Sequence, residues 1–385
     1  MRQRISGGLI AVFFSVTLLV ACAPKAAPVP SPGPVAPQVT PAKPALAAPT
    51  MIPEDAAWTK VVEAAKKEGK LIVYTTHFFG DVGIQITKTF AERTGIRVDL
   101  ISAPGGTSVE RIKTEHRVGS PVASVLTAAG TFVLIAKQDG LTQRVGDVPE
   151  VRDERIRTYD PWLDKDGHML SLQLVPVNPW INTKLVQPGT EPTSWLDLLK
   201  PKWKGKIGIP EPDSAPSANY MFYGLTTRGR LDLSYFTELS KQDLIFQITT
   251  QFNSAALSRG DFPLSFVGGT STNSMGPFLH EGAPIKAIDM AEGIVIYRTG
   301  GVALLQSAPH SNAGRVFINW LFSQEGQTIF HKATLNVGFR KDVPSFVPPG
   351  GQFTPSNPIM MTLEDELEIA KIQRNRTLSK ILRGG

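Results

Sequence analysis

Four short stretches rich in glycine, threonine and serine carry side chains that could bind a small solute. They are 75–77 (Thr-Thr-His), 105–108 (Gly-Gly-Thr-Ser), 213–219, and 268–272, where Gly-Gly-Thr-Ser occurs a second time. Glycine lets the backbone approach a ligand closely, and hydroxyl groups both donate and accept hydrogen bonds. The stretches therefore suit a small polar or anionic solute, although each could also be an ordinary turn whose hydroxyls cap the backbone.

The residues expected to contact the solute lie in these stretches, with one more, Thr250, in the later segment 246–257. The candidates are Thr75, Thr76, His77, Gly106, Thr107, Ser214, Ser217, Asn219, Thr250, Gly269, Thr270 and Ser271. The stretch 213–219 leads into an apolar run at 220–225, so it should feed a helix N-terminus, which attracts anions.

Other chemistry finds little support in the sequence. The six histidines show no His-Glu-x-x-His spacing or other close pair, so we expect neither a metal site nor a cofactor. The single cysteine, Cys22, excludes an intramolecular disulfide and a cysteine metal cluster. The rival from another class is a serine hydrolase, but the chain contains no Gly-x-Ser-x-Gly elbow, so we expect no enzyme activity.

The elements that position the first two stretches follow a βαβ pattern. Strands are predicted at 71–75, 96–101 and 122–127, and helices at 81–94, from a Ser108 cap to 118, and toward Gly140. This alternation predicts a parallel sheet with helices on both faces. Ligands of such sheets bind beyond the carboxyl ends of the strands, where the candidate stretches lie.

A second set of elements should follow a loop-like segment at 158–167. The stretch 192–210 predicts a short helix capped by Thr193 or Ser194, ended by Pro201, and then a buried strand. Further strands are expected at 172–177, 263–267, 285–288 and 294–305, and helices near 220 and at 232–240. A last helix, with Thr362 as its cap, should pack on the second part of the molecule.

Length and charge set limits on partners. The chain of 385 residues is long enough for two cores. Its formal charge of +6 comes without a dense run of lysine or arginine, so no nucleic-acid partner is expected.

The N-terminus predicts export and anchoring. Arg2 and Arg4 precede an apolar run at 8–20, as in a secretory signal peptide, here 1–21. The residues Leu-Val-Ala-Cys at 19–22 resemble the bacterial lipobox, which implies acylation of Cys22, with palmitate among the chains, and lipid anchoring outside the cytoplasm. The proline-rich stretch 22–53 then predicts an extended tether.

The stretches 192–210, 300–304 and 309–327 closely resemble the extracellular solute-binding proteins of bacterial ABC importers, in the branch that includes ferric-ion, thiamine and phosphonate binders. The resemblance runs from about residue 71 to 343. It implies an α/β fold of two lobes, each a doubly wound and mostly parallel sheet, joined by a hinge. Lobe 1 would comprise 54–157 and 290–340, and lobe 2 would comprise 158–289 and 341–385. A monomer of this kind would capture a small polar, anionic solute and deliver it to a membrane permease.

Two alternatives within the resemblance stay open. Ferric-ion binders hold iron with two adjacent tyrosines, a histidine and a carboxylate. In this chain the tyrosine positions fall on Thr270 and Ser271, the carboxylate position falls on Ala129, and His77 is one residue out of register. Ferric iron prefers hard anionic oxygen donors, so this pattern disfavours iron. The second alternative is a solute-sensing domain for a membrane kinase.

Overall fold

The computed structural model describes residues 56–78, 80–145, 147–152, 163–213, 216–271, 274–336 and 338–384. The predicted signal peptide, Cys22 and the tether lie outside the described residues, as does Ser214. Among the helices of these ranges, none combines the length and the apolar character needed to cross a membrane.

Helices and strands alternate in the first part of the chain, as the βαβ pattern predicts. They are α1 (Ala56–Glu68), β1 (Lys70–Thr75), α2 (Gly80–Thr94), β2 (Arg97–Ser102), α3 (Gly105–Arg117), β3 (Val125–Ala128), α4 (Gly130–Gln138), β4 (Thr142–Gln143) and α5 (Pro149–Arg152).

The second part contains longer strands and a C-terminal group of helices. It comprises β5 (Leu170–Asn182), η2 (Trp195–Leu199), η3 (Pro201–Trp203), β6 (Ile207–Pro210), α6 (Pro216–Thr227), α7 (Leu233–Ser240), β7 (Ile245–Gln247), α8 (Thr250–Arg259), β8 (Leu264–Gly268), α9 (Gly276–His280), β9 (Ile285–Ala287), β10 (Ile294–Leu305), α10 (Ser311–Leu321), α11 (Gln324–Thr334), β11 (Pro358–Met360), α12 (Asp365–Arg374) and α13 (Thr377–Leu382).

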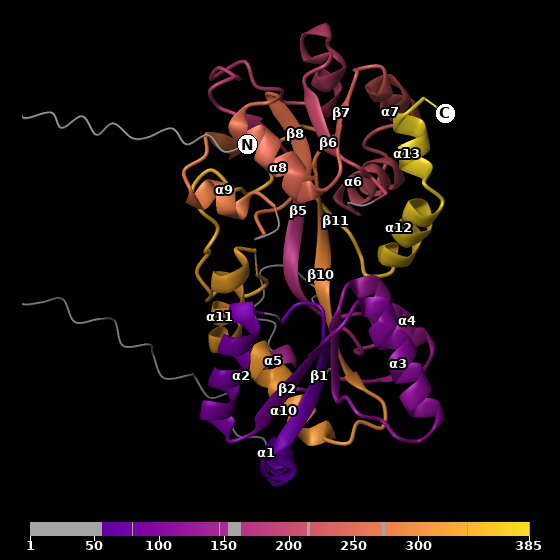
Figure 1. Ribbon diagram of the computed structural model, residues 1–385, viewed down its shortest axis with the longest axis vertical. Coiled ribbons are helices and arrows are strands. Elements are labelled where there is room, and N and C mark those ends of the chain that lie inside the picture. The colour runs from indigo at the N-terminus through magenta and orange to yellow at the C-terminus, as the bar shows by residue number, and fades with distance from the viewer. Residues whose placement is uncertain are drawn as a thin grey trace, which may run out of the picture. The chain divides into compact units, whose positions relative to one another are not determined.

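Two long strands, β5 and β10, connect two groups of parallel strands (Figure 1). The sheet order is β2-β1-β3-β10-β5-β8-β6-β7, with β4 and β11 beside β10 and β9 beside β5. Strands β2, β1 and β3 are parallel, and so are β8, β6 and β7. Strands β10 and β5 run antiparallel to each other and to the neighbouring strand of each group. We call the β1–β3 group with its helices lobe 1, and the β6–β8 group with its helices lobe 2.

The register of the long strands makes the two lobes face each other. Ala128, at the end of β3, pairs with Gly301 of β10, which also pairs with Ser171 of β5. Gly268, at the end of β8, pairs with Val177 of β5. Because β3 runs in the direction of β5 and β8 runs against it, both ends point into the same interval. From Ser171 to Val177 that interval is about 20 Å of extended strand.

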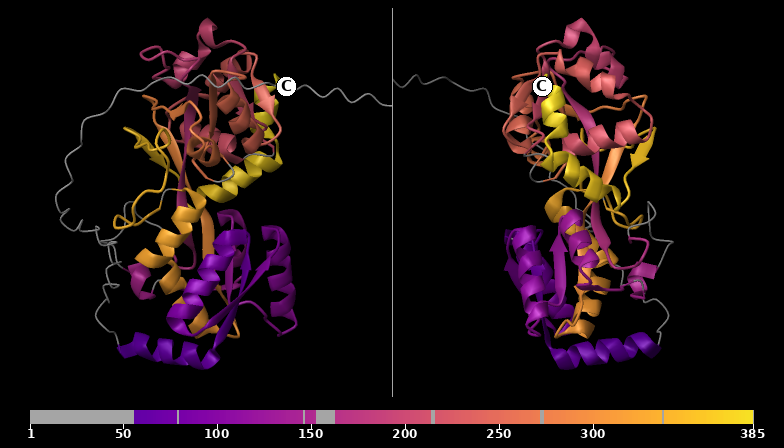
Figure 2. Two further views of the ribbon diagram at one scale, coloured as in Figure 1. Left: turned by 60° about the vertical axis from the view of Figure 1, so that its left-hand side comes forward. Right: turned by 90° about the vertical axis from the view of Figure 1, so that its right-hand side faces the viewer.

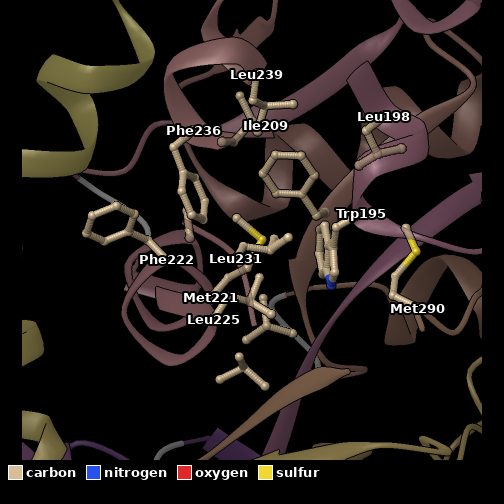
Figure 3. Packing of buried hydrophobic residues seen from close by; sticks show 14 of the residues in the cluster. Trp195, Leu198, Ile209, Met221, Phe222, Leu225, Leu231, Phe236, Leu239 and Met290 are labelled. Atoms are coloured by element: carbon tan, nitrogen blue, oxygen red, sulfur yellow. The ribbon is translucent and has the colours of Figure 1, made fainter. Parts of the chain in front are cut away.

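Each lobe has its own core of buried apolar side chains. In lobe 1 the rings of Phe90 and Phe317 meet edge to face at 5.2 Å. In lobe 2 Trp195 and Phe236 belong to the cluster shown in Figure 3. Strand β5 contributes Leu172 to the first core and residues from Val177 onward to the second, so this strand belongs to both lobes. The residue bounds predicted for the lobes stay a prediction.

The stretch 192–210 forms the predicted break and strand, and its short helix is a 3₁₀ helix. Ser194 caps η2, accepting a hydrogen bond from the backbone N–H of Leu196 at 3.1 Å. Asp197 accepts from the backbone N–H of Ser194 in return, which completes a capping box. Trp195 is then buried and donates from Nε1 to the carbonyl of Gly293 at 2.9 Å.

One local prediction is wrong, and another is incomplete. Helix α3 begins at Gly105, and Ser108 is buried inside it and does not cap it. The predicted last helix begins at Asp365, which exchanges hydrogen bonds with Thr362, and it packs on lobe 2 as predicted, but not on lobe 2 alone. Leu363 and Leu367 join a lobe 1 cluster, because this helix also packs against α4.

The cap of η2 predicts a stability effect. Ser194→Ala removes the cap and a hydrogen bond from Ser194 Oγ to Glu292 at 2.5 Å. We expect a loss of about 1–2 kcal/mol in the free energy of unfolding, measured by denaturant titration. Ser234→Ala on α7 is the control, because Ser234 is exposed. Equal midpoints for the two variants would contradict this role.

His331 on α11 predicts an acid-sensitive component of stability. It is buried, its Nε2 lies 3.0 Å from Oε1 of Gln327, and burial lowers its pKa to about 4. The unfolded chain, with a pKa near 6.5, takes up the proton first, so stability is lost as pH falls from about 6.5 to 4. In thermal melts across this window, His331→Gln should lose less stability than the parent. The exposed control His280→Gln should follow the parent, and parallel curves for all three proteins would refute the assignment.

Candidate functional site

The carboxyl-end edge of lobe 1 brings the first predicted stretch next to β3. The hydroxyl of Thr75 lies 2.6 Å from that of Thr127, and it accepts from the backbone N–H groups of His77 at 3.0 Å and Phe78 at 2.9 Å. Thr75 is fully buried, so its hydroxyl shapes the loop. Thr76 and His77, which are partly exposed, are the groups that this loop presents.

His77 is an uncharged hydrogen-bonding group. Burial lowers its pKa to about 4, although a hydrogen bond with the backbone of Thr127 opposes the shift. The hydroxyl of Thr76 lies 3.2 Å from Nδ1 of His77. At neutral pH this edge therefore offers a hydroxyl and a neutral imidazole, and His77 supplies no positive charge.

The second stretch forms the first turn of α3, beside the first turn of α4. A Cβ atom at Gly105 would lie 2.3 Å from the ring of Phe132, and one at Gly106 would lie 3.4 Å from it. Glycine is thus required for the close approach of the two helix N-termini. Thr107 is exposed on α3, and Ala129 is exposed directly before α4.

The opposite edge, in lobe 2, is built by the ends of β6 and β8. Ser217 lies in the first turn of α6; its Oγ is buried and has no hydrogen-bond partner among the described residues. A Cβ atom at Gly268 would lie 3.0 Å from Cβ of Ser217, so the end of β8 touches this turn. Asn219 donates to the carbonyl of Pro212 at 2.7 Å and fixes the loop before α6.

The remaining predicted residues follow β7 and β8. Gly269 has φ +63°, and its N–H donates to the carbonyl of Pro176. Thr270 is buried, and its hydroxyl donates to the carbonyl of Leu335 at 2.7 Å, so this hydroxyl holds the loop in place. Ser271 and Thr250 are half-buried, with Thr250 opening α8.

Sequence reasoning missed a buried polar cluster beside Ser217. The rings of Tyr220 on α6 and Tyr297 on β10 stack at 3.8 Å, and the Tyr220 hydroxyl donates to the carboxyl group of Glu366. Burial raises the pKa of both phenols, so both stay protonated at neutral pH. The spacing of Ser217 and Tyr220 on one helix was a weak signal, and nothing local pointed to Glu366.

Taken together, the two facing edges offer helix N-termini, hydroxyls and neutral rings. In the part of the chain that the structure describes, no group of three or more histidine, cysteine or acidic residues could hold a metal ion. Backbone N–H groups at helix N-termini favour anions through partial positive charge. These edges therefore suit noncovalent binding of a polar or anionic group.

Known proteins share both the sequence pattern and the fold. Residues 71–335 match the family model described as bacterial extracellular solute-binding protein. A "Putative 2-aminoethylphosphonate-binding periplasmic protein" of Salmonella typhi is 26% identical over 262 residues, covering 66% of this chain and 73% of that protein.

Two solved structures illustrate the likeness in fold. IdiA (FutA) of Trichodesmium, in complex with iron and citrate, has a TM-score of 0.65 and 18% identity, covering 82% of this chain and 99% of that one. AfuA from Actinobacillus pleuropneumoniae, with fructose-6-phosphate bound, has a TM-score of 0.57 and 20% identity, covering 81% and 97%. The predicted two-lobed α/β fold is confirmed. Since the matching region covers most of the chain, the protein belongs to the bacterial extracellular solute-binding protein family.

Proposed function

We propose that this protein is the extracytoplasmic receptor of an ABC importer, which captures a small polar, anionic solute between its lobes and delivers it to the membrane permease. The proposal that the solute is an anion rests on the surroundings of Ser217. Its Oγ is buried, lacks a partner among the described residues and lies in the first turn of a twelve-residue helix. A bound anion would satisfy this hydroxyl and the neighbouring backbone N–H groups together.

Closure of the lobes supplies the second half of the site. The partly exposed Thr76 and His77 lie on the opposite edge, where neutral donors can meet the solute without adding charge. Bending at β5 and β10 would bring this edge toward Ser217 and exclude water, which strengthens each hydrogen bond to the anion. The name of the Salmonella typhi relative supports a phosphonate as the first solute to test.

Anchoring belongs to the same proposal. Acylation of Cys22 would hold the receptor at the membrane, and the proline-rich tether would let a monomeric receptor reach the permease. The predicted residue bounds, 1–21 for the signal peptide and 22–53 for the tether, are part of this proposal.

Ferric binding is the second candidate, because the Trichodesmium structure of this fold contains iron. The residues of this chain disfavour it. Thr270 and Ser271 carry no phenolate, Ala129 carries no carboxylate, and Tyr220 is buried and stacked on the partly buried ring of Tyr297.

Replacement of Ser217 should weaken solute binding. In titration calorimetry with 2-aminoethylphosphonate, inorganic phosphate and citrate, Ser217→Ala should lose about 1.5–3 kcal/mol on the anion that the parent binds. That loss is roughly ten- to a hundredfold in affinity. The melting temperature without solute should stay nearly unchanged, since Ser217 Oγ makes no bond within the described residues.

The control is Thr227→Ala, which changes a hydroxyl at the other end of α6. It should bind like the parent. Unchanged affinity in Ser217→Ala removes the first turn of α6 from the site, and a parent that binds none of the three anions contradicts the anionic choice.

Iron gives a separate prediction. Addition of ferric citrate to the protein should produce no tyrosinate-to-iron absorption in the visible range, because the raised pKa values of Tyr220 and Tyr297 keep both phenols protonated. A visible band that disappears in Tyr220→Phe would establish an iron site instead.

A further inference from the structure

The C-terminal segment crosses from one lobe to the other. Helix α12 lies between α6 of lobe 2 and α4 of lobe 1 in Figure 1, and it packs against both helices (Figure 2). Met361 and Ile369 belong to the core of lobe 2, whereas Leu363 is buried in a lobe 1 cluster. The segment thus links the lobes at a place separate from the strands β5 and β10.

One end of this link is fastened firmly on the lobe 2 side. Strand β11 pairs in parallel with the start of β10. Arg298 of β10 donates from Nη1 to the carbonyl of Met361 at 2.5 Å. Asp365 forms an ion pair with Arg228, which follows α6, at 2.7 Å. Backbone pairing, a buried hydrogen bond and a partly buried ion pair therefore hold the segment to lobe 2 and the long strands.

The other end depends on Glu366. This residue is only 3% exposed; its Oε2 accepts from the Tyr220 hydroxyl and lies 3.5 Å from Oγ1 of Thr131 in the first turn of α4. Its Cδ lies 3.4 Å from the Cβ position of Gly130. Helix α4 has no side-chain cap at Ala129, and the carboxyl group of Glu366 lies against its first turn.

We propose that segment 358–374 is a latch that ties α4 of lobe 1 to α6 of lobe 2, and that Glu366 is the group that fastens it. Any motion that separates the two helices must pull Glu366 away from Tyr220 or from Thr131. The latch therefore restrains the bending of β5 and β10 and sets how far the lobes separate without solute.

The surroundings of Glu366 make the latch sensitive to pH. The titratable and charged groups near it are Tyr220 on α6, Tyr297 and Arg298 on β10, and Asp365 on its own helix; α4 contributes the uncharged Thr131. Burial raises the pKa of Glu366 to about 7. Ionisation in this buried place is unfavourable, so the latch holds best in acid and weakens as pH rises through about 7.

The test measures the distance between the lobes without any solute, so its failure is separate from a failure of the proposed function. In the full chain with Cys22→Ser, spin labels are placed at Arg117→Cys on α3 and Thr237→Cys on α7, both exposed positions. Glu366→Ala should lengthen and broaden the distance distribution at pH 6. Glu368→Ala, which changes an exposed glutamate on the same helix, should leave it unchanged.

Two further measurements, on Tyr220→Phe and on the pH dependence of Glu366→Gln, decide the question if Glu366→Ala folds poorly. Tyr220→Phe keeps the stacked ring but removes the donor to Glu366, and it should also lengthen the distance. The labelled parent should shift to longer distances between pH 5.5 and 8.5, whereas Glu366→Gln should show one distribution at both values. Distances equal to the parent in both Glu366→Ala and Tyr220→Phe overturn the latch, and so does the same pH shift in Glu366→Gln and the parent.

Discussion

The pairing of β10 with β5 is the constraint on which the rest of the structure depends. These antiparallel strands enter both cores, and their register fixes where each group of parallel strands ends. Because the groups run in opposite directions, the helix N-termini that follow their strands point into one interval. A shift of the register by one residue would turn every side chain of these strands to the other face and uncouple the two edges.

The candidate side chains at the two facing edges are uncharged at neutral pH. His77 is neutral, the phenols of Tyr220 and Tyr297 are protonated, and the threonine and serine groups carry no charge. Positive potential then comes from the backbone at helix N-termini, which needs no desolvated cation. In the proposed mode of binding, backbone and hydroxyl donors would hold the anion, and separation of the lobes would release it.

The sequence predicted the parts of the fold that depend on local pattern. The strands and helices around β1 to β3 and the cap at Ser194 follow from apolar runs and capping residues within a few positions. The role of Gly105 could not be predicted, because it depends on the distant ring of Phe132. Nor could the sequence predict that the hydroxyl of Thr270 donates to the carbonyl of Leu335, or that the carboxyl group of Glu366 lies against α4. Each of these contacts joins residues far apart in the chain.

Hydrogen–deuterium exchange with and without saturating 2-aminoethylphosphonate tests the central claim most directly, because it reports both edges in one experiment. If the lobes close on an anion, the backbone N–H groups at 217–219 and at 75–77 should gain protection together. Protection at one edge alone, or only at a surface outside both edges, would contradict a site formed between the lobes.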